Sequence, residues 1–557
     1  MLLRLAALFG LIACGAVMSP GSVWSQEEST RKFPVPEAAA LEAATKLVDE
    51  LFQKEIAAAK TPEARLAVLK QLREAADKSG DDHNAEYVLL QRAIAVSADV
   101  PTPEQLLDTL QDLESHFEVD AIAIRADAAA RLAKAAKQTE EVSVFINLTH
   151  EVVTRALAAD RYEQALAMTT TAGNEVKRFK NGALTKTINE LAETARHCQQ
   201  EFDAIAASRE ALAKDENDSD AALAVGRYRC FIQKNWAAGL PLLARGSDKV
   251  LREVAARDLE DTIPGHQRKA IADGWYDFSK TEKGPAQEQS RRRALHWYRD
   301  ALPSLTDLAQ TIATKRIDEL QTLIPIGPFP WGAVVVMSFE KPTWDTRGRS
   351  QFVNDLSGWK NSALVSGATM VDGKVGKAIS FDGRDDYLEF ADAPSLNPPT
   401  LSICTWAYLR NWQRGSRAHY LVSKEDSNNG EHGFVLRFSE RGGRLVANFT
   451  IGDRDAWHEL STQQTTKVES GTWYHLAATY DGHKLRQYLN GQLDGERLYN
   501  GKVTPSKYRL RIGRGQFSPD RKLDGIVDEV AIFARALNAE EVDTMYRMGL
   551  AGKPLAK

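Results

Sequence analysis

The sequence predicts a multidomain protein in which an all-α region of helical hairpins precedes an all-β antiparallel sandwich. With 557 residues, the chain is too long for a single hydrophobic core. Apolar residues recur at steps of three and four over residues 37–324, and short β-rich runs separated by turn residues occupy 333–549. Hydrophobic residues make up 43% of the chain and charged residues 26%, as in soluble folded proteins. We therefore expect two folded regions joined by a linker at 325–332.

The N-terminus has the pattern of a secretory signal peptide. A short positive segment, Met1 to Arg4, precedes an apolar run from Leu5 to Ala13, and Val23 to Ser25 form a cleavage pattern. Removal of residues 1–25 would place the mature protein in the periplasm, at the cell surface or outside the cell, with no integral membrane segment. Two alternatives stay open: a membrane anchor, which needs about 20 unbroken apolar residues, and a lipoprotein acylated at Cys14.

The charge balance argues against nucleic acid as a partner, and the number of cysteines argues against a disulfide framework. The chain has 71 Lys and Arg residues against 76 Asp and Glu, a net charge of -5, so it lacks the basic excess that nucleic-acid binding requires. Three cysteines follow the signal segment, and an odd number argues against a disulfide framework. Cys198 and Cys230 lie on predicted helices of neighbouring hairpins and are a candidate pair, whereas Cys404 is expected to be a buried strand residue.

Amphipathic stripes begin the helical region after a polar lead, Glu27 to Pro36. Within each stripe the apolar residues lie on one face of a helix. The first two stripes are formed by Leu41, Ala44, Val48, Leu51, Phe52 and Ile56, then by Leu66, Leu69, Leu72 and Ala76. Similar stretches follow as far as Leu323, with Gly, Asp, Asn or Pro in most of their short connections. Consecutive helices are therefore expected to pack as antiparallel hairpins.

Several hairpins resemble tetratricopeptide-type repeats, with a bulky aromatic residue followed by small ones. The resemblance is clearest at Arg161 to Leu166, and weaker at Asn235 to Leu240 and Ala294 to Tyr298. Because a regular period of about 34 residues is missing, both an α-solenoid and a compact helical bundle stay open. Residues 235–302 also resemble helical stretches of secreted planctomycete proteins, a resemblance that implies no activity.

Catalytic motifs are missing from the helical region. His150-Glu151 begins like a zinc-protease helix, but Thr154 stands where the second histidine ligand belongs. His197 lies beside Cys198 without a CxxC pattern or a fourth ligand at a standard spacing. The basic run Arg291 to Arg293 is most simply a solvated face or a donor of inter-helix salt bridges.

A different architecture begins after the linker. Short β-rich runs alternate with turn residues, which is typical of an antiparallel sandwich. Two hairpin signals are strong: Asp481-Gly482 and Asn490-Gly491. The runs are Ala333–Phe339, Lys377–Phe381, Tyr387–Phe390, Leu401–Leu409, Tyr420–Ser423, Phe434–Phe438, Leu445–Ile451, Trp473–Tyr480, Arg486–Leu489, Tyr508–Ile512 and Ile526–Phe533. Asn538, with Glu541 three residues later, forms a capping pattern for a short terminal helix at 539–547.

A set of motifs in this region resembles the laminin-G-like (concanavalin-A-like lectin/glucanase) jelly-roll family. The matching residues are Phe339-Glu340, Asp355 to Gly358, Gly376 to Gly383, Asp385 to Tyr387, Leu401 to Trp406, Trp473 to Gly482, Tyr488 to Gly491, Leu523 to Val530, Arg535 to Leu537 and Glu540-Glu541. Their order and spacing imply a jelly-roll fold for residues 333–549. The set is specific for the fold and much less specific for function.

The resemblance also implies a structural calcium ion, held by carboxylates and backbone carbonyls. Glu340 and Asp355 lie near the first strand and Asp528 lies on the last. These three are candidate ligands because the terminal strands of a jelly roll lie close together.

An enzymatic role is not expected. Glucanases of this architecture carry alternating carboxylates on one strand face, with the nucleophile and the acid about 5 Å apart. A Glu-x-Asp-x-x-Glu pattern is absent, and the adjacent Asp528 and Glu529 are expected on opposite faces of a strand. Nor does the region contain a Gly-x-Ser-x-Gly nucleophile motif.

We therefore interpret the chain as an exported, non-catalytic binding protein that recognises a glycan or a cell-surface protein through its C-terminal sandwich. Loops on a rigid scaffold are a common location for recognition, and sugar rings stack on aromatic faces. The candidate contacts are the loop-borne or edge aromatics Trp412, Tyr420, Trp457 and Tyr499. Two alternatives stay open: a structural envelope or scaffold protein with protein partners only, and a cryptic carbohydrate-active hydrolase.

Overall fold

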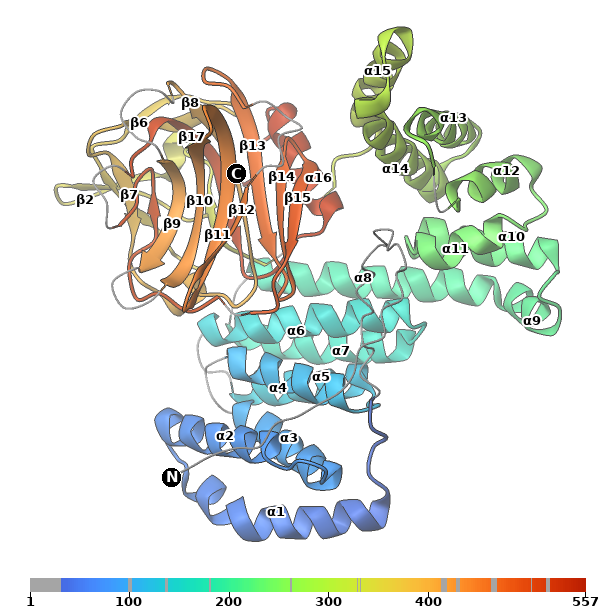
Figure 1. The fold of residues 1–557 in the computed structure, drawn as a ribbon, viewed down its shortest axis with the longest axis vertical. Helices are drawn as coiled ribbons and strands as arrows, with labels where there is room; N and C mark the ends of the chain where they lie inside the picture. Colours follow the sequence, from blue (N-terminus) through green and yellow to red (C-terminus); the bar gives the residue numbers. More distant parts are fainter. Residues whose placement is uncertain are drawn as a thin grey trace, which may run out of the picture.

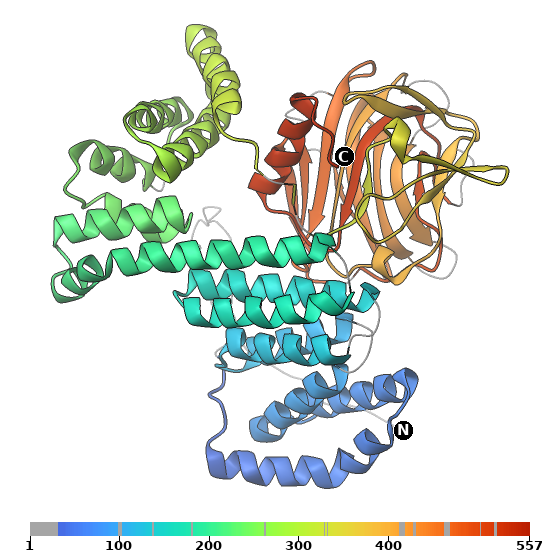
Figure 2. The ribbon, with the colours of Figure 1, turned by 180° about the vertical axis from the view of Figure 1, so that it is seen from behind.

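A curved helical arm and a β-sandwich seated against it make up the described part of the chain (Figure 1, Figure 2). The computed structural model describes residues 32–556, except 99–102, 136–138, 180–181, 261–262, 328, 331, 412–417, 427–430, 462–467, 502 and 517–520. The expected signal peptide and Trp412 lie outside these residues. The arrangement confirms the predicted fold class, with the change of architecture at the expected linker.

The arm consists of fifteen α-helices among the described residues. They are α1 (Ala38–Ala58), α2 (Pro62–Asp77), α3 (His83–Ser97), α4 (Pro103–His116), α5 (Ala121–Ala135), α6 (Thr139–Ala158), α7 (Tyr162–Val176), α8 (Gly182–Ala204), α9 (Ala206–Lys214), α10 (Ser219–Arg227), α11 (Trp236–Leu243), α12 (Lys249–Asp258), α13 (Gly265–Thr281), α14 (Gly284–Ala301) and α15 (Asp307–Leu323). Figure 1 shows the hairpins stacked along a curved path, so the arm is a helical-hairpin solenoid rather than a compact bundle. The tetratricopeptide-type assignment stays a prediction.

Two separate hydrophobic cores stabilise the arm. One core is formed by α1 to α8, and the other by residues from Cys230 in the π-helical turn after α10 to Ile324 after α15. The hydroxyl groups of Tyr162 and Tyr228 lie 2.5 Å apart and join α7 to that turn. No helix in the described part of the chain is both long and apolar enough to cross a bilayer.

The three cysteines in the described part of the chain are buried and free. The candidate pair of Cys198 and Cys230 is not formed. Burial raises the pKa of both thiols, so neither is activated as a nucleophile. Cys404 lies fully buried on a strand, as the sequence predicts.

The sandwich consists of two antiparallel sheets. The first has the order β15-β14-β13-β8-β17-β6-β5, with β1 paired to β17, and the second has the order β12-β11-β10-β9-β16-β7-β4-β3-β2. The strands are β1 (Ala333–Met337), β2 (Trp344–Arg347), β3 (Ser350–Val353), β4 (Ala363–Ser366), β5 (Thr369–Asp372), β6 (Lys377–Asp382), β7 (Tyr387–Phe390), β8 (Leu401–Leu409), β9 (Ala418–Asp426), β10 (Glu431–Arg441), β11 (Arg444–Arg454), β12 (Trp457–Ser461), β13 (Trp473–Tyr480), β14 (Lys484–Leu489), β15 (Gln492–Leu498), β16 (Arg511–Ile512) and β17 (Asp524–Phe533). Both predicted hairpin turns are confirmed, between β13 and β14 and between β14 and β15.

One sheet of the sandwich is covered on its outer face. The helix α16 (Ala539–Leu550) lies over the eight-stranded sheet, and a small apolar cluster fills the space between them. Asn538 and Glu541 form the predicted capping box at the start of this helix. The main core lies between the two sheets. The nine-stranded sheet therefore presents its outer face on the opposite side of the sandwich from α16.

Side-chain contacts join the arm to the sandwich at α16 and, among the described residues, also at Ala534. Glu540 on α16 forms ion pairs with Lys234 and Arg292, each at 3.3 Å, and Asp543 pairs with Arg299 at 2.9 Å. Farther along the arm, Nδ2 of Asn147 on α6 donates a 2.7 Å hydrogen bond to the carbonyl of Ala534. The sandwich is thus held by side-chain contacts in addition to the linker.

Arg547 adds a buried contact at the first of these two places. The residue is only 3% exposed. Its side chain donates hydrogen bonds to the carbonyls of Gln321 and Ile324 at the end of α15. A cation at the C-terminus of a helix satisfies carbonyls that have no partner within the helix. Arg547 therefore fastens α16 to the last helix of the arm.

Candidate functional site

A one-residue bulge in β17 brings two acids to the same side of the eight-stranded sheet. Asp528 pairs with Trp406 and Ala531 with Cys404, so β17 has one extra residue between these pairs. Glu529 occupies the bulge with a φ of +51°. Strict alternation along β17 predicts that the two carboxylates lie on opposite faces. That prediction is wrong because the bulge breaks the alternation.

Three carboxylates gather where β17 meets the loop before β6. Oδ2 of Asp528 accepts a 2.8 Å hydrogen bond from the Val375 amide, and Oε1 of Glu340 accepts one of 2.9 Å from the Lys377 amide. Oε2 of Glu529 accepts a 2.5 Å hydrogen bond from the Leu555 amide. Oδ1 of Asp528 and Oε1 of Glu529 are buried and have no hydrogen-bond partner in the described structure. A buried carboxylate oxygen without a hydrogen-bond partner lowers the free energy of unfolding.

The electrostatics of this cluster favour a positive ligand. Burial, with a contribution from the Glu340 charge, raises the pKa of Asp528 to about 7. Burial and the neighbouring Asp528 raise the pKa of Glu529 to about 9. Either protons or a cation must neutralise these groups, and carboxylate oxygens are the ligands that Ca²⁺ prefers. Glu340, Asp528 and Glu529 therefore offer the donor chemistry that calcium prefers, although they do not bring three ligand atoms within 4.8 Å of one another.

The remaining predicted metal ligand has other partners. Oδ1 of Asp355 accepts hydrogen bonds from the amides of Val336 and Ser357, both at 2.9 Å. Its Oδ2 accepts from the Ser357 hydroxyl at 2.6 Å and from the Asn361 amide at 3.0 Å. Both oxygens thus already accept hydrogen bonds that order the segment after β3. The assignment of Asp355 as a metal ligand stays a prediction.

A second acidic group lies at the surface. Asp382, Asp385 and Asp386 are the only residues in the described part of the chain that bring three ligand atoms within 4.8 Å of one another. Oδ2 of Asp386 accepts a hydrogen bond from the Asp382 amide, and Oδ1 of Asp382 accepts one from the Arg384 amide. These contacts are those of an acidic turn, which needs no ion to be satisfied.

A row of polar side chains crosses the outer face of the nine-stranded sheet. A bulge in β9 sends Leu421 and Val422 into the core and leaves Tyr420 opposite Arg437. Nη1 of Arg437 donates to the Tyr420 hydroxyl at 2.9 Å, and its Nη2 donates to Oε2 of Glu459 at 2.7 Å. Asn448 donates to Oε1 of the same glutamate at 3.1 Å. These groups fix one another's positions on the sheet.

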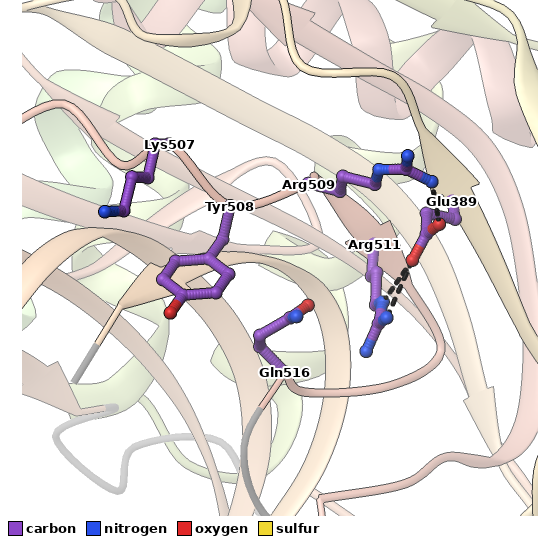
Figure 3. Close-up of a pocket in the computed structure, with 6 residues that line it drawn as sticks. All are labelled: Glu389, Lys507, Tyr508, Arg509, Arg511 and Gln516. Carbon is purple, nitrogen blue, oxygen red and sulfur yellow. Dashed lines mark hydrogen bonds and ion pairs between the residues drawn. The ribbon is translucent and has the colours of Figure 1, made fainter. Parts of the chain in front are cut away.

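A pocket of about 350 Å³ lies on the same sheet, beside β7 and β16 (Figure 3). Its lining residues are Glu389, Lys507, Tyr508, Arg509, Arg511 and Gln516. Arg511 donates from Nε and Nη2 to Oε2 of Glu389 at 2.9 and 2.7 Å, and Arg509 donates to Oε1 at 2.6 Å. Burial alone would raise the pKa of Glu389, but the two guanidinium groups outweigh it and lower that pKa.

A buried lysine fixes one wall of this pocket. The Nζ of Lys424, which is fully buried, donates to the carbonyls of Ser506 and Tyr508, both at 2.6 Å, and to Oδ1 of Asp392 at 2.8 Å. Burial lowers the pKa of this ammonium, while Asp392 opposes the shift. Gly433 supports the same wall, since its amide donates to the Thr504 carbonyl at 2.8 Å.

Of the four aromatic residues predicted to contact a ligand, the three that the structure describes do not line the pocket. Trp412 lies outside the described residues. Tyr420 is 1% exposed, beneath the guanidinium groups of Arg437 and Arg521. Trp457 is half-buried at the start of β12. Tyr499 packs against the core and donates a 2.7 Å hydrogen bond to Oδ2 of Asp453.

The pocket residues were missed by sequence reasoning, although a signal existed. Lys507, Arg509 and Arg511 alternate along the segment that enters β16. A period of two places such side chains on one face of an extended segment. The alternation therefore predicts a basic stripe on this segment.

Part of the C-terminal sandwich matches a known protein family. Residues 382–543 match the Laminin_G_3 family model, the concanavalin A-like lectin/glucanases superfamily. The match confirms the resemblance of this lectin/glucanase-like domain, and it does not extend to the arm. No curated protein matches the sequence closely enough to indicate a relative.

Several solved structures are similar to part of the chain. The binding domain of Paraclostridial Mosquitocidal Protein 1 is 19% identical, with a TM-score of 0.32 over 39% of this chain and 52% of that chain. Domain 4 of AbnA, an extracellular arabinanase from Geobacillus stearothermophilus in complex with arabinotriose, is 17% identical, with a TM-score of 0.31 over 38% and 98%. The binding domain of botulinum neurotoxin serotype D is 13% identical, with a TM-score of 0.31 over 39% and 51%. The chain thus spans about half the length of each toxin domain.

Proposed function

We propose that this protein is a non-catalytic binding protein whose lectin/glucanase-like domain recognises a glycan on the outer face of the nine-stranded sheet. The observation that supports this is the pocket at Lys507 to Arg511, which is held in place by Lys424 and lies on a rigid sheet. Side chains that are already fixed lose little conformational freedom on binding. A pocket of about 350 Å³ is at the small end of the range for ligand sites.

The chemistry of the pocket argues against hydrolysis. Glu389 is the only carboxylate among the described lining residues, and two arginines hold its pKa low. Glycosidases need a second carboxylate and an acid with a raised pKa. The buried pair Asp528 and Glu529 lies on the other sheet, beneath α16, where a polysaccharide has no access.

A binding array tests the proposal. The full chain, incubated with arrayed glycans and with cell-surface proteins, is expected to bind a glycan and to release no reducing sugar from it. Tyr508→Ala should weaken binding about fivefold, because an aromatic contact contributes about 1 kcal/mol. Trp457→Ala, which changes an aromatic residue outside the pocket, should leave binding unchanged. Binding of surface proteins alone, or steady release of sugar, would reject the proposal.

The proposal includes export, because the N-terminal sequence has the pattern of a signal peptide. Expression with secretion should yield a mature protein that begins at Gln26. Mass spectrometry of the intact secreted protein measures this terminus directly. An acylated Cys14 terminus would replace the cleaved form with a lipoprotein, and an uncut Met1 terminus would reject export through this signal.

The proposal also includes a structural calcium ion at Glu340, Asp528 and Glu529. Its role would be to neutralise these buried carboxylates and so to stabilise the closure of β17 against the loop before β6. The ion would lie on the opposite side of the sandwich from the glycan pocket.

A further inference from the structure

We infer that the pocket at Lys507 to Arg511 selects an acidic saccharide, one that carries a carboxylate or a sulfate ester. This inference deepens the proposed function and rests on it. Three cationic side chains and one carboxylate line the pocket. The whole chain has a net charge of -5, so the pocket reverses the sign of the molecule locally.

Donors remain available for an anion after the internal contacts are made. Arg511 donates to Glu389 from Nε and Nη2, so its Nη1 is left for a ligand. Arg509 donates to Glu389 from Nη1 alone, so its Nε and Nη2 are left. Lys507 is exposed and has no acidic partner within the described residues. Figure 3 shows the Lys507 ammonium and the Tyr508 hydroxyl on one side of the pocket, with both guanidinium groups on the other. Guanidinium groups bind carboxylate and sulfate oxygens through paired hydrogen bonds.

The positive surface continues beyond the pocket. Arg511 and Arg514 lie over the same Tyr387 ring, with 4.9 and 5.6 Å between each guanidinium carbon and the ring centroid. Stacking on an aromatic face holds a guanidinium group in one orientation. The cations therefore lie over β16 and β7, two inner strands of the nine-stranded sheet, where a chain of acidic sugar units could contact them in succession.

The other lining groups suit the neutral parts of a sugar. Gln516 brings a side-chain amide to the lining, and an amide can exchange hydrogen bonds with sugar hydroxyls. Tyr508 offers a ring and a hydroxyl beside it. Nucleic acids are bound mainly through many phosphates over an extended basic surface, whereas this site combines one pocket with acceptors and an acidic chain overall. The combination favours an acidic polysaccharide.

The test compares matched polymers on the full chain. Dextran sulfate is paired with dextran, and polygalacturonate with its methyl ester, and affinity is measured by calorimetry at rising salt. At least one acidic polymer should bind at least tenfold more tightly than its neutral partner. The variant Lys507→Ala/Arg509→Ala should lose at least tenfold of that affinity. The control Lys54→Ala/Arg257→Ala removes the same charge from exposed positions on the arm and should lose none.

Each result is decisive. Equal binding of neutral and acidic partners would overturn this inference and leave the proposed glycan function standing. Binding of duplex DNA or of anionic vesicles as tightly as the acidic polymers would also overturn it, by showing a general affinity for polyanions. Absence of binding to every saccharide would instead reject the proposed function itself. A preference for dextran sulfate over polygalacturonate, or the reverse, identifies the acidic group.

Discussion

Calcium is expected to raise the melting temperature of the full chain, and Asp528→Asn combined with Glu529→Gln should abolish the rise. The ion would neutralise two buried carboxylates whose second oxygens have no partner in the described structure. A ligand at 100 times its dissociation constant adds about 2.7 kcal/mol of stability. Scanning calorimetry in excess calcium and in chelator measures the difference.

The pH dependence sharpens this test. The folded state holds the protons of Asp528 and Glu529 more tightly than the unfolded chain, because their pKa values are raised to about 7 and about 9. Metal-free stability should therefore fall as the pH rises from about 4 towards 9. Calcium needs deprotonated ligands, so its effect should be larger at about pH 8 than at about pH 5. Asp528→Asn in chelator should melt no lower than the wild type at the higher pH.

A surface substitution shows whether calcium binds at the buried carboxylates or at the acidic turn. Asp385→Asn removes one exposed acid of the second cluster and should leave the calcium effect intact. If it abolishes the effect, the ion binds at the turn instead. Identical melting curves in calcium and in chelator would remove the metal from the proposal altogether.

Gly433→Ala is expected to destabilise the sandwich by about 3 kcal/mol. Gly433 has a φ of +85°, and an added Cβ would overlap the carbonyl oxygen of Lys424 on the neighbouring strand. The same Cβ would lie 3.2 Å from Cβ of Ser506, on the wall of the pocket. The substitution must therefore separate β9 from β10 and disturb the wall. Urea unfolding monitored by tryptophan fluorescence measures the loss.

The hairpin turn between β10 and β11 provides a matched control. Gly442 also has a positive φ, +58°, but an added Cβ meets nothing within 4 Å. Gly442→Ala should cost only about 1 kcal/mol, from the backbone conformation alone. Equal losses for the two variants would show that the contact with Lys424 is unimportant and that backbone strain explains both.

The predictable parts of the fold are those with local causes. Apolar periodicity predicts the helices of the arm, and Asp481-Gly482 and Asn490-Gly491 predict two hairpins, because a turn depends on its own residues. The short strands β2 to β5 were missed. Several of their side chains are exposed or only half-buried, so they lack the alternation that identifies a strand.

The sites were harder to predict because two β-bulges determine which side chains lie on the same face. The bulge at Glu529 brings a second carboxylate to the side of Asp528, and the bulge at Leu421 leaves Tyr420 on the outer face. Such a shift depends on pairing with a distant strand, which local sequence does not encode. Asp528 and Glu340 do accept hydrogen bonds from amides of the same segment before β6, while their assignment as metal ligands stays a prediction. The resemblance placed them on terminal strands that meet in space.

The contacts between the arm and the sandwich would determine how a mechanical load on the sandwich reaches the arm. Tension on a polymer bound at the nine-stranded sheet would enter the arm through α16 and through Asn147, as well as through the linker. The ion pairs of Glu540 and Asp543 and the Arg547 contacts with α15 would share that force before the linker is stretched. The arm would then act as a strut that keeps the recognition face pointing in a fixed direction, rather than as a flexible tether.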